Sequence, residues 1–394
     1  MGLILMEEKE KFHTRNVLPV AMAHFIHDVY SSFLAPLLPL LIQKLSISYS
    51  YAGLFAFCQR VPSLFNFIIG MHLDRLKIRY FVIFTPGITA VCMSLLGLSP
   101  HYAVAVILLL SMGISGAFFH VPAPVMIKRF SGNRVGRGMS FYMVGGELAR
   151  TLGPIIILGA VSLWGLEGTY RLIPFGVAAS AWLFIRFRNI PIQQEKREKQ
   201  SYSAFKKAFY IHISLFLCIA GIIIFRSFMK SAIVNFLPTY LSVKGQSLWF
   251  GGLSLSVFEL AGAAGTFLAG NLSDRLGRTN TLLIITILTP LLMLLFIFST
   301  GFWVFPILLL MGFFMLSSGP VVLALVMDRA TEHQTFMNGI YMTITFLSDS
   351  LTALMIGVMG DWVGLISTYK ISAFLAFLAI PFVLLLTFKV EKNK

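Results

Sequence analysis

One short polar pattern occurs twice in this chain, 200 residues apart: GMHLDRLKIR at 70–79 and GNLSDRLGR at 270–278. Each copy follows one apolar segment and precedes another. A polar turn repeated between apolar segments is typical of a duplicated membrane protein. The residues that recur at matching offsets are Gly70, Asp74 and Arg75, and Gly270, Asp274 and Arg275.

The composition places the chain in a membrane. Of its 394 residues 57% are hydrophobic and only 12% are charged, whereas soluble domains have about 25% charged residues. A membrane-spanning helix needs about 20 mostly apolar residues. Twelve segments meet this requirement: 17–43, 49–72, 80–98, 102–127, 136–163, 169–187, 208–241, 249–272, 279–299, 302–327, 335–360 and 366–388.

The net charge of +15 reflects topology rather than nucleic-acid binding. If both termini are cytoplasmic, most of the 31 Lys and Arg residues lie in the tails and cytoplasmic loops. This is the positive-inside bias. The sequence therefore predicts a multi-pass protein of the cell (inner) membrane with cytoplasmic termini, and no nucleic-acid partner.

The longest polar stretch between spans divides them six and six. We therefore predict an all-α integral membrane fold with twelve transmembrane helices in two six-helix bundles, at 1–187 and 208–394, joined by a cytoplasmic linker at 188–207. The loops leave no room for a catalytic domain, and no Walker-type phosphate-binding motif is present. No enzyme activity, cofactor or resident metal is expected.

Ionisable side chains inside the spans are the sharpest functional signal, because each costs at least about 2.5–3.5 kcal/mol at mid-bilayer. They fall on spans 1, 2, 5, 7, 8 and 11 and on none of spans 3, 6, 9 and 12. They comprise four acids and four bases, which favours pairing around a central cavity. They are Asp28, Glu147, Glu259, Asp349, Arg60, Arg150, Arg226 and Lys230.

His24, His27 and Asp28 share one face of the first span, because they stand at positions i, i+3 and i+4. We predict that Asp28 carries a coupling proton, that His24 or His27 tunes it, and that Asp349 is the second choice. A structural polar cluster is one alternative. A divalent-metal site is another, with His120 as the further ligand that it needs.

Arg226 and Lys230 lie one turn apart in the seventh span and repel each other unless an acid or an anion lies between them. We predict that they bind an anionic group of a solute. The alternative is an ion pair with Glu259 or Asp349. The other candidates for substrate contact are His120, Glu147, Arg150, Glu259 and Arg60, of which Glu147 and Arg150 are expected to pair within their helix.

The two polar turns resemble the cytoplasmic loops between helices 2 and 3 and between helices 8 and 9 of major facilitator superfamily transporters. Three further stretches resemble the fosmidomycin-resistance family within it. HFIHD at 24–28 with PLLPL at 36–40 is similar to that family's first helix, GISGAFFH at 113–120 to its fourth, and residues 137–154 to its fifth. The resemblance covers most of the first half of the chain and implies transport by alternating access.

Three departures from these patterns matter. Lys77-Ile78-Arg79 stands where a Gly-Arg pair is usual, Ala123 stands where the family has an acid after its histidine and proline, and Glu147 stands where it tends to have asparagine. Substrate identity is therefore not carried over.

The resulting prediction is a secondary active transporter, acting as a monomer, that exports a small organic and possibly anionic solute or drug by proton antiport. Its partners are the solute, protons and the lipid bilayer. A divalent-metal or metal-chelate transporter and a non-transporting membrane sensor or scaffold are the alternatives. The turn residues Asp74 and Asp274 are expected to face helix N-termini or arginines across the cytoplasmic side of the bundle interface and to latch the outward-facing state.

Overall fold

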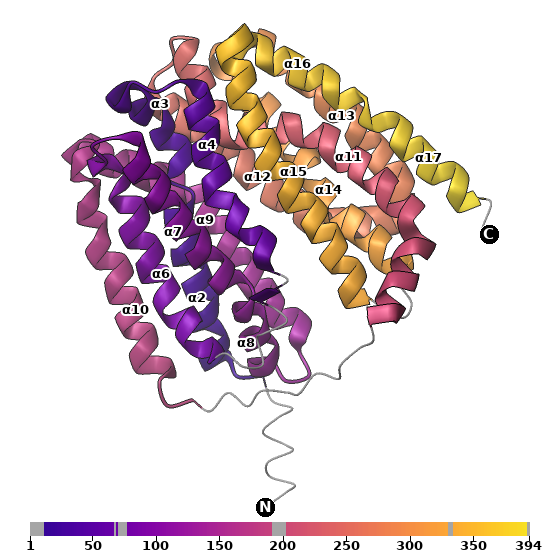
Figure 1. Ribbon diagram of the computed structural model, residues 1–394, viewed down its shortest axis with the longest axis horizontal. Helices are drawn as coiled ribbons and strands as arrows, with labels where there is room; N and C mark the ends of the chain where they lie inside the picture. The colour runs from indigo at the N-terminus through magenta and orange to yellow at the C-terminus, as the bar shows by residue number, and fades with distance from the viewer. Residues whose placement is uncertain (1–11, 67, 70–76, 191–201, 330–333, 392–394) are drawn as a thin grey trace, which may run out of the picture. The chain divides into compact units, whose positions relative to one another are not determined.

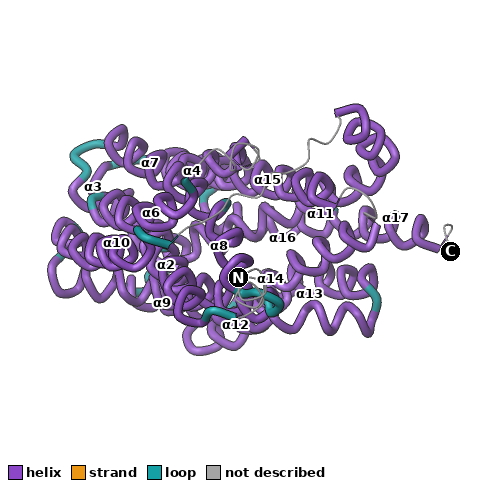
Figure 2. Tube along the Cα trace, turned by 90° about the horizontal axis from the view of Figure 1, so that it is seen from below, coloured by secondary structure: helices purple, strands orange, loops and turns teal. Residues whose placement is uncertain are grey.

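The computed structural model describes residues 12–66, 68–69, 77–190, 202–329 and 334–391. These residues form helices joined by short loops, without a β-strand in the described ranges (Figure 2). The chain divides into two compact units. Unit 1 contains residues 1–41 and 58–197, and unit 2 contains residues 42–57 and 198–394. The predicted division at 188–207 stays a prediction.

Unit 1 is built around α2 (Thr14–Ser31), which packs against α9 (Val135–Trp164) and α6 (Ile78–Ser94) (Figure 1). The other helices of this unit are α7 (Tyr102–His120), α8 (Pro122–Phe130) and α10 (Ile173–Phe187), and α3 (Leu34–Leu45) begins here. The core at one end holds Val17, Val20 and Ala23 of α2 beside Ile127 and Phe187. Apolar residues at helical spacing on α2 thus bury one stripe of the helix.

Unit 2 contains α11 to α17. They are α11 (Tyr202–Val243), α12 (Leu248–Leu276), α13 (Arg278–Phe298), α14 (Val304–Arg329), α15 (Gln334–Val363), α16 (Leu365–Phe377) and α17 (Ala379–Glu391). Helix α12 packs along α14, and α11 packs along α15 and α16. Most of α4 (Tyr49–Arg60) also clusters with this unit.

Two local signals explain where α12 begins and ends. The side chain of Ser247 accepts a hydrogen bond from the backbone N–H of Phe250 at 3.1 Å, so it caps the first turn. Gly277 has φ 87°, a conformation that other residues rarely adopt, and it lets the chain turn from α12 into α13. The backbone conformation therefore requires glycine at position 277, near the end of the second polar turn.

The helices are those of a membrane protein, as predicted. Ten helical segments of the described chain are long and apolar enough to cross a bilayer. The predicted span 49–72 lies partly outside the described residues. The predicted span 169–187 is divided, because a 3₁₀ helix occupies Glu167–Leu172 and a separate helix, α10, begins at Ile173 with Pro174 in its first turn.

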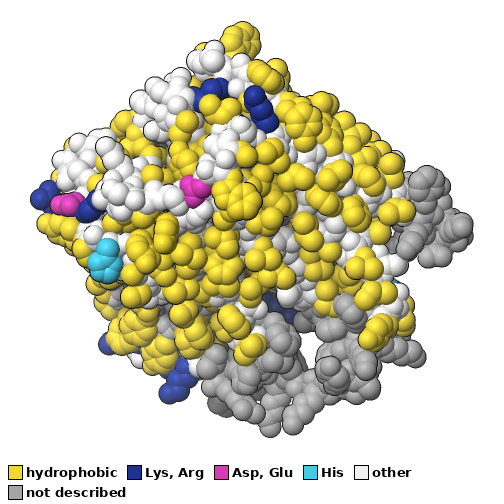
Figure 3. All heavy atoms as spheres, turned by 45° about the horizontal axis from the view of Figure 1, so that its top comes forward, with side chains coloured by type: hydrophobic (Ala, Val, Ile, Leu, Met, Phe, Trp, Pro, Cys, Tyr) yellow, Lys and Arg dark blue, Asp and Glu magenta, His cyan; other side chains and the backbone are white. Residues whose placement is uncertain are grey.

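The surface of the protein is largely apolar. Apolar side chains dominate the face drawn in Figure 3, and charged ones are few there. Large side chains such as Leu163, Phe267 and Trp362 are more than 70% exposed. A surface of this kind is stable in lipid and would aggregate in water.

Candidate functional site

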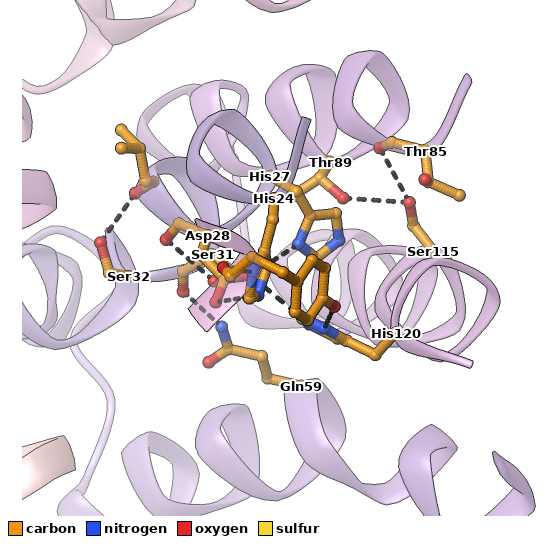
Figure 4. Close-up of polar contacts among 12 residues, drawn as sticks. His24, His27, Asp28, Ser31, Ser32, Gln59, Thr85, Thr89, Ser115 and His120 are labelled. Atoms are coloured by element: carbon orange, nitrogen blue, oxygen red, sulfur yellow. Dashed lines mark hydrogen bonds and ion pairs between the residues drawn. The ribbon is translucent and has the colours of Figure 1, made fainter. Parts of the chain in front are cut away.

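The first polar centre lies inside unit 1, on the face of α2 that turns toward α7 and α9. His24, His27 and Asp28 are all buried, and His27 is fully enclosed. Their i, i+3 and i+4 spacing places them together, as predicted from the sequence. His120, at the end of α7, completes the group, and Figure 4 shows the three imidazoles turned toward the carboxylate.

Three imidazole nitrogens approach Asp28 within hydrogen-bonding or ion-pairing distance. The Nε2 atom of His24 lies 3.3 Å from Oδ2, the Nδ1 atom of His27 lies 3.0 Å from Oδ1, and the Nε2 atom of His120 lies 3.4 Å from Oδ1. A buried carboxylate is costly unless it is paired. The imidazoles therefore supply the partners that permit an acid in this membrane-spanning helix.

Tyr142 of α9 fixes the orientation of two of these rings. Its backbone carbonyl accepts a hydrogen bond from Nδ1 of His24 at 2.7 Å, and its hydroxyl lies 3.4 Å from Nδ1 of His120. The rings of Tyr142 and His24 also stack, with centroids 3.9 Å apart. Because a carbonyl oxygen can only accept, the His24 proton sits on Nδ1, and its Nε2 faces the carboxylate.

Phe119 orients the third ring. The imidazole of His27 stacks on it at 4.7 Å with planes 8° apart. Its Nε2 is buried and has no hydrogen-bond partner among the described residues. This arrangement leaves Nδ1 of His27 as the nitrogen that donates to Asp28.

The second polar centre lies inside unit 2, between α11 and α15. Lys230 Nζ lies 2.6 Å from Asp349 Oδ2, and the hydroxyl of Ser227 donates to Oδ1 at 3.0 Å. The side chain of Asp349 is 8% exposed, whereas that of Lys230 is 34% exposed. The ion pair with Asp349, predicted as the alternative to an anionic solute, is therefore present, and it neutralises Lys230.

Comparison with known proteins identifies the family. The model of the Major Facilitator Superfamily matches residues 20–352 and 252–394. The chain belongs to the Major Facilitator Superfamily. It is a multi-pass membrane transporter of small molecules rather than an enzyme, as predicted, and the sensor or scaffold alternative is set aside.

Two relatives align over most of the chain. An uncharacterized transporter of the superfamily from Bacillus subtilis (strain 168), YfnC, is 25% identical and the alignment covers 92% of this chain and 90% of the relative. The fosmidomycin resistance protein of Escherichia coli (strain K12) is 23% identical over 91% and 89%. The predicted resemblance to the fosmidomycin-resistance family is confirmed.

Solved superfamily structures share the fold. A bacterial homologue of the human lysosomal transporter Spinster, in an inward-facing and occupied conformation, aligns with a TM-score of 0.77 at 14% identity and covers 97% of this chain and 98% of that one. A D-xylose–proton symporter aligns with a TM-score of 0.73 at 13% identity over 95% and 97%. The predicted fold class is therefore confirmed.

Within this superfamily fold, Arg226 is a deeply buried cation of unit 2. It is 8% exposed, and one of its terminal nitrogens donates to the carbonyl of Met315 at 3.0 Å. Its Nε has no hydrogen-bond partner among the described residues. The predicted contact of Arg226 and Lys230 with an anionic solute stays a prediction. Asp349 pairs directly with Lys230, so Arg226 is the cation that this prediction assigns to the solute.

The remaining candidates for substrate contact are dispersed. Glu147 and Arg150 of α9 form the predicted pair within their helix. Glu259 is buried in α12, and Arg60 is partly exposed at the end of α4. Their predicted contacts with a solute stay predictions.

The second polar turn of the superfamily transporter is tied together by Arg278. Its guanidinium lies 2.5 Å from Asp274 Oδ1 and 3.1 Å from Asp328 Oδ2, so it links the end of α12 to α14. Asp274 thus has an arginine partner, and the partner is the last residue of the pattern rather than Arg275. Gly70, Asp74 and Arg75 of the first turn lie outside the described residues.

Two residues with clear structural roles were not among the predicted site residues. Tyr142 reaches His24 over 118 positions of sequence, and no local pattern marks such a contact. Asp361, near the end of α15, accepts hydrogen bonds from the backbone N–H groups of Tyr49 and Ser50, both at 2.8 Å, and so caps the start of α4 in unit 2. Only its position, an acid at the edge of an apolar span, distinguished it.

Proposed function

We propose that this transporter exports a small organic solute in exchange for protons, as a monomer in a bacterial inner membrane with both termini cytoplasmic. Three observations support the proposal. The E. coli relative is a fosmidomycin resistance protein, which motivates export. The basic residues follow the positive-inside bias. Unit 2 holds a buried carboxylate paired with a partly exposed ammonium group, and this pair carries the proposal of proton coupling.

The Lys230–Asp349 pair can exist in two states. At 2.6 Å, the ionised carboxylate holds the ammonium group directly. A proton on Asp349 removes this attraction and leaves the Lys230 charge without its counterion. Because an isolated charge is costly inside a membrane, the two states differ in the conformation and hydration that they favour. Proton binding can bias a transport cycle through an element of this kind, because the element has two discrete states.

Other groups around Asp349 set the balance between these states. Arg226 of α11 and Tyr341 of α15 lie near enough to interact with it electrostatically, and Ser227 donates to its ionised form. The exposure of Lys230 gives a solute access to the pair. We place the coupling proton on Asp349 rather than on Asp28, because Asp28 is already shared among three imidazoles that also suit another ligand.

The charge of the solute determines the direction of coupling. Protonation of Asp349 raises the net charge of the pair from zero to plus one. A cationic solute group then binds the protonated state more weakly, and an anionic group binds it more tightly. Exchange requires the proton and the solute to bind alternately. We therefore expect exchange for a solute that presents a cationic group to Asp349. An anionic solute would move with the proton, so the proposed exchange and the predicted anionic solute are alternatives at this pair.

The test is transport in proteoliposomes with an imposed pH gradient. Fosmidomycin, a panel of small organic cations and anions, and Zn²⁺ for the metal-transport alternative would be loaded in turn. We expect the unmodified protein to drive at least one solute uphill, and Asp349→Asn to catalyse exchange of that solute without uphill transport. The control is Asp361→Asn, which removes a carboxylate from the same helix and should keep the pH dependence.

Two outcomes would count against the proposal. Uphill, pH-driven transport by Asp349→Asn would remove Asp349 as the coupling site. Folded protein that moves no organic solute in response to the gradient would remove proton-coupled export itself, and movement of Zn²⁺ alone would favour the metal-transport alternative.

A further inference from the structure

The geometry of unit 1 points to a binding site for one transition-metal dication of the Zn²⁺ class, held by His24, Asp28 and His120. This inference goes beyond the proposed function. It concerns a different unit from the Lys230–Asp349 pair, and it departs from the expectation that the chain has no resident metal. The argument rests on the spacing of the ligand atoms, on their supporting contacts and on access to the site.

The spacing suits a small dication. Zn²⁺ binds imidazole nitrogen and carboxylate oxygen at about 2.0–2.1 Å, so neighbouring ligand atoms of a tetrahedral site lie roughly 3.3 Å apart. Oδ2 of Asp28 lies 3.3 Å from Nε2 of His24, and Oδ1 of Asp28 lies 3.4 Å from Nε2 of His120, so each imidazole faces its own oxygen of the carboxylate. The ligand atoms of the three residues all lie within 4.8 Å of one another. An ion between the two imidazoles would therefore meet the carboxylate through one or both oxygens, and the partly exposed His120 ring is the ligand with most room to adjust.

The supporting contacts match those of metal-binding histidines. Such histidines direct the nitrogen that does not bind metal to a carbonyl or another polar group, which fixes the tautomer. Here Nδ1 of His24 donates to the Tyr142 carbonyl, and Nδ1 of His120 faces the Tyr142 hydroxyl. The carboxylate ligand also has its own donor, Nδ1 of His27. All three ligands thus have an outer contact. The ligands belong to α2 and α7, and Tyr142 of α9 supports both histidines.

The site has an unresolved conflict that a cation would remove. With its proton on Nδ1, a neutral His24 directs the Nε2 lone pair at the Asp28 carboxylate, and these two electron-rich groups repel. Either a proton or a metal ion must lie between them. His120 directs a second Nε2 to the same carboxylate, and one dication could satisfy both nitrogens at once.

The donor set and the access route define the ligand further. Two imidazoles and one carboxylate favour Zn²⁺, Co²⁺, Ni²⁺ or Cu²⁺, whereas Mg²⁺ and Ca²⁺ prefer oxygen ligands. The His120 side chain is 39% exposed, so the fourth position can be reached from outside the core and would hold water. A metal at this position would join α2 to α7.

The test is calorimetric titration of tag-free purified protein with Zn²⁺, and with Mg²⁺ for comparison. We expect one equivalent of Zn²⁺ to bind and to raise the melting temperature, and Mg²⁺ to do neither. His120→Ala, the least buried of the ligand changes, should weaken Zn²⁺ binding about tenfold or more, and His24→Ala and Asp28→Asn should do the same. His101→Ala, at the start of α7 and outside the cluster, should bind like the unmodified protein.

Binding is measured without transport, so this test can fail while the proposed function stands, and the reverse also holds. Absence of Zn²⁺ binding at millimolar concentration would overturn the inference. Binding that all four variants retain would assign the ion to an adventitious surface site, and equal binding of Mg²⁺ would exclude the imidazole ligands. Failure of His24→Ala to fold leaves His120→Ala to decide.

Discussion

Gly145 controls how closely α9 approaches α2, and therefore how Tyr142 reaches His24. A Cβ atom added at Gly145 would lie 2.6 Å from the backbone oxygen of Ala21, closer than real Cβ contacts allow. Because a backbone atom cannot rotate away, Gly145→Ala must push the two helices apart. Overpacking of this kind costs about 1–3 kcal/mol.

Gly159 provides the matched control on the same helix. A Cβ atom there meets nothing within 4 Å. Alanine is favoured over glycine in a helix by about 1 kcal/mol, so Gly159→Ala should be neutral or stabilising. Both variants gain the same helix propensity, so it cancels in the comparison. We therefore expect Gly145→Ala to be less stable than Gly159→Ala by about 1–3 kcal/mol.

The assay is thermal unfolding of both purified variants in one detergent, followed by the calorimetric Zn²⁺ titration. We expect a lower melting temperature for Gly145→Ala and weaker Zn²⁺ binding, because the 2.7 Å bond from His24 to the Tyr142 carbonyl would lengthen. A Gly145→Ala protein that melts at or above the temperature of Gly159→Ala would refute the close packing of α2 and α9.

Three further predictions follow from individual contacts. Lys230→Met leaves the buried Asp349 carboxylate without its ammonium partner, so it should lower the melting temperature, while the double variant with Asp349→Leu should recover most of the loss. Asp361→Asn weakens the cap at the start of α4 and should cost about 1 kcal/mol, seen as faster amide hydrogen exchange in that first turn and not elsewhere. Gly146→Ala places a methyl group 2.5 Å from Cε1 of His24 and should reduce both Zn²⁺ binding and the melting temperature, since the buried ring must give up its hydrogen bond to the Tyr142 carbonyl in order to move.

The fold class and one polar face could be predicted from the sequence alone. Apolar runs of about 20 residues can only be satisfied as membrane helices, because lipid offers the backbone no hydrogen-bonding partner. The repeated polar turn further indicated that the chain is built from two similar halves. The spacing of His24, His27 and Asp28 determined that they share a face, since helix geometry fixes i, i+3 and i+4 neighbours.

Side-chain partners on distant helices could be identified only from the packing of the folded protein. From the sequence, the partner of Lys230 was either an anionic solute or one of two acids, Glu259 and Asp349. The packing of α11 against α15 selects Asp349. Tyr142 and Asp361 could not be found in advance, because each acts through atoms more than 100 residues away. Helix periodicity reports which face a residue occupies. Which side chain lies opposite depends on the packing of whole helices, and that information is non-local.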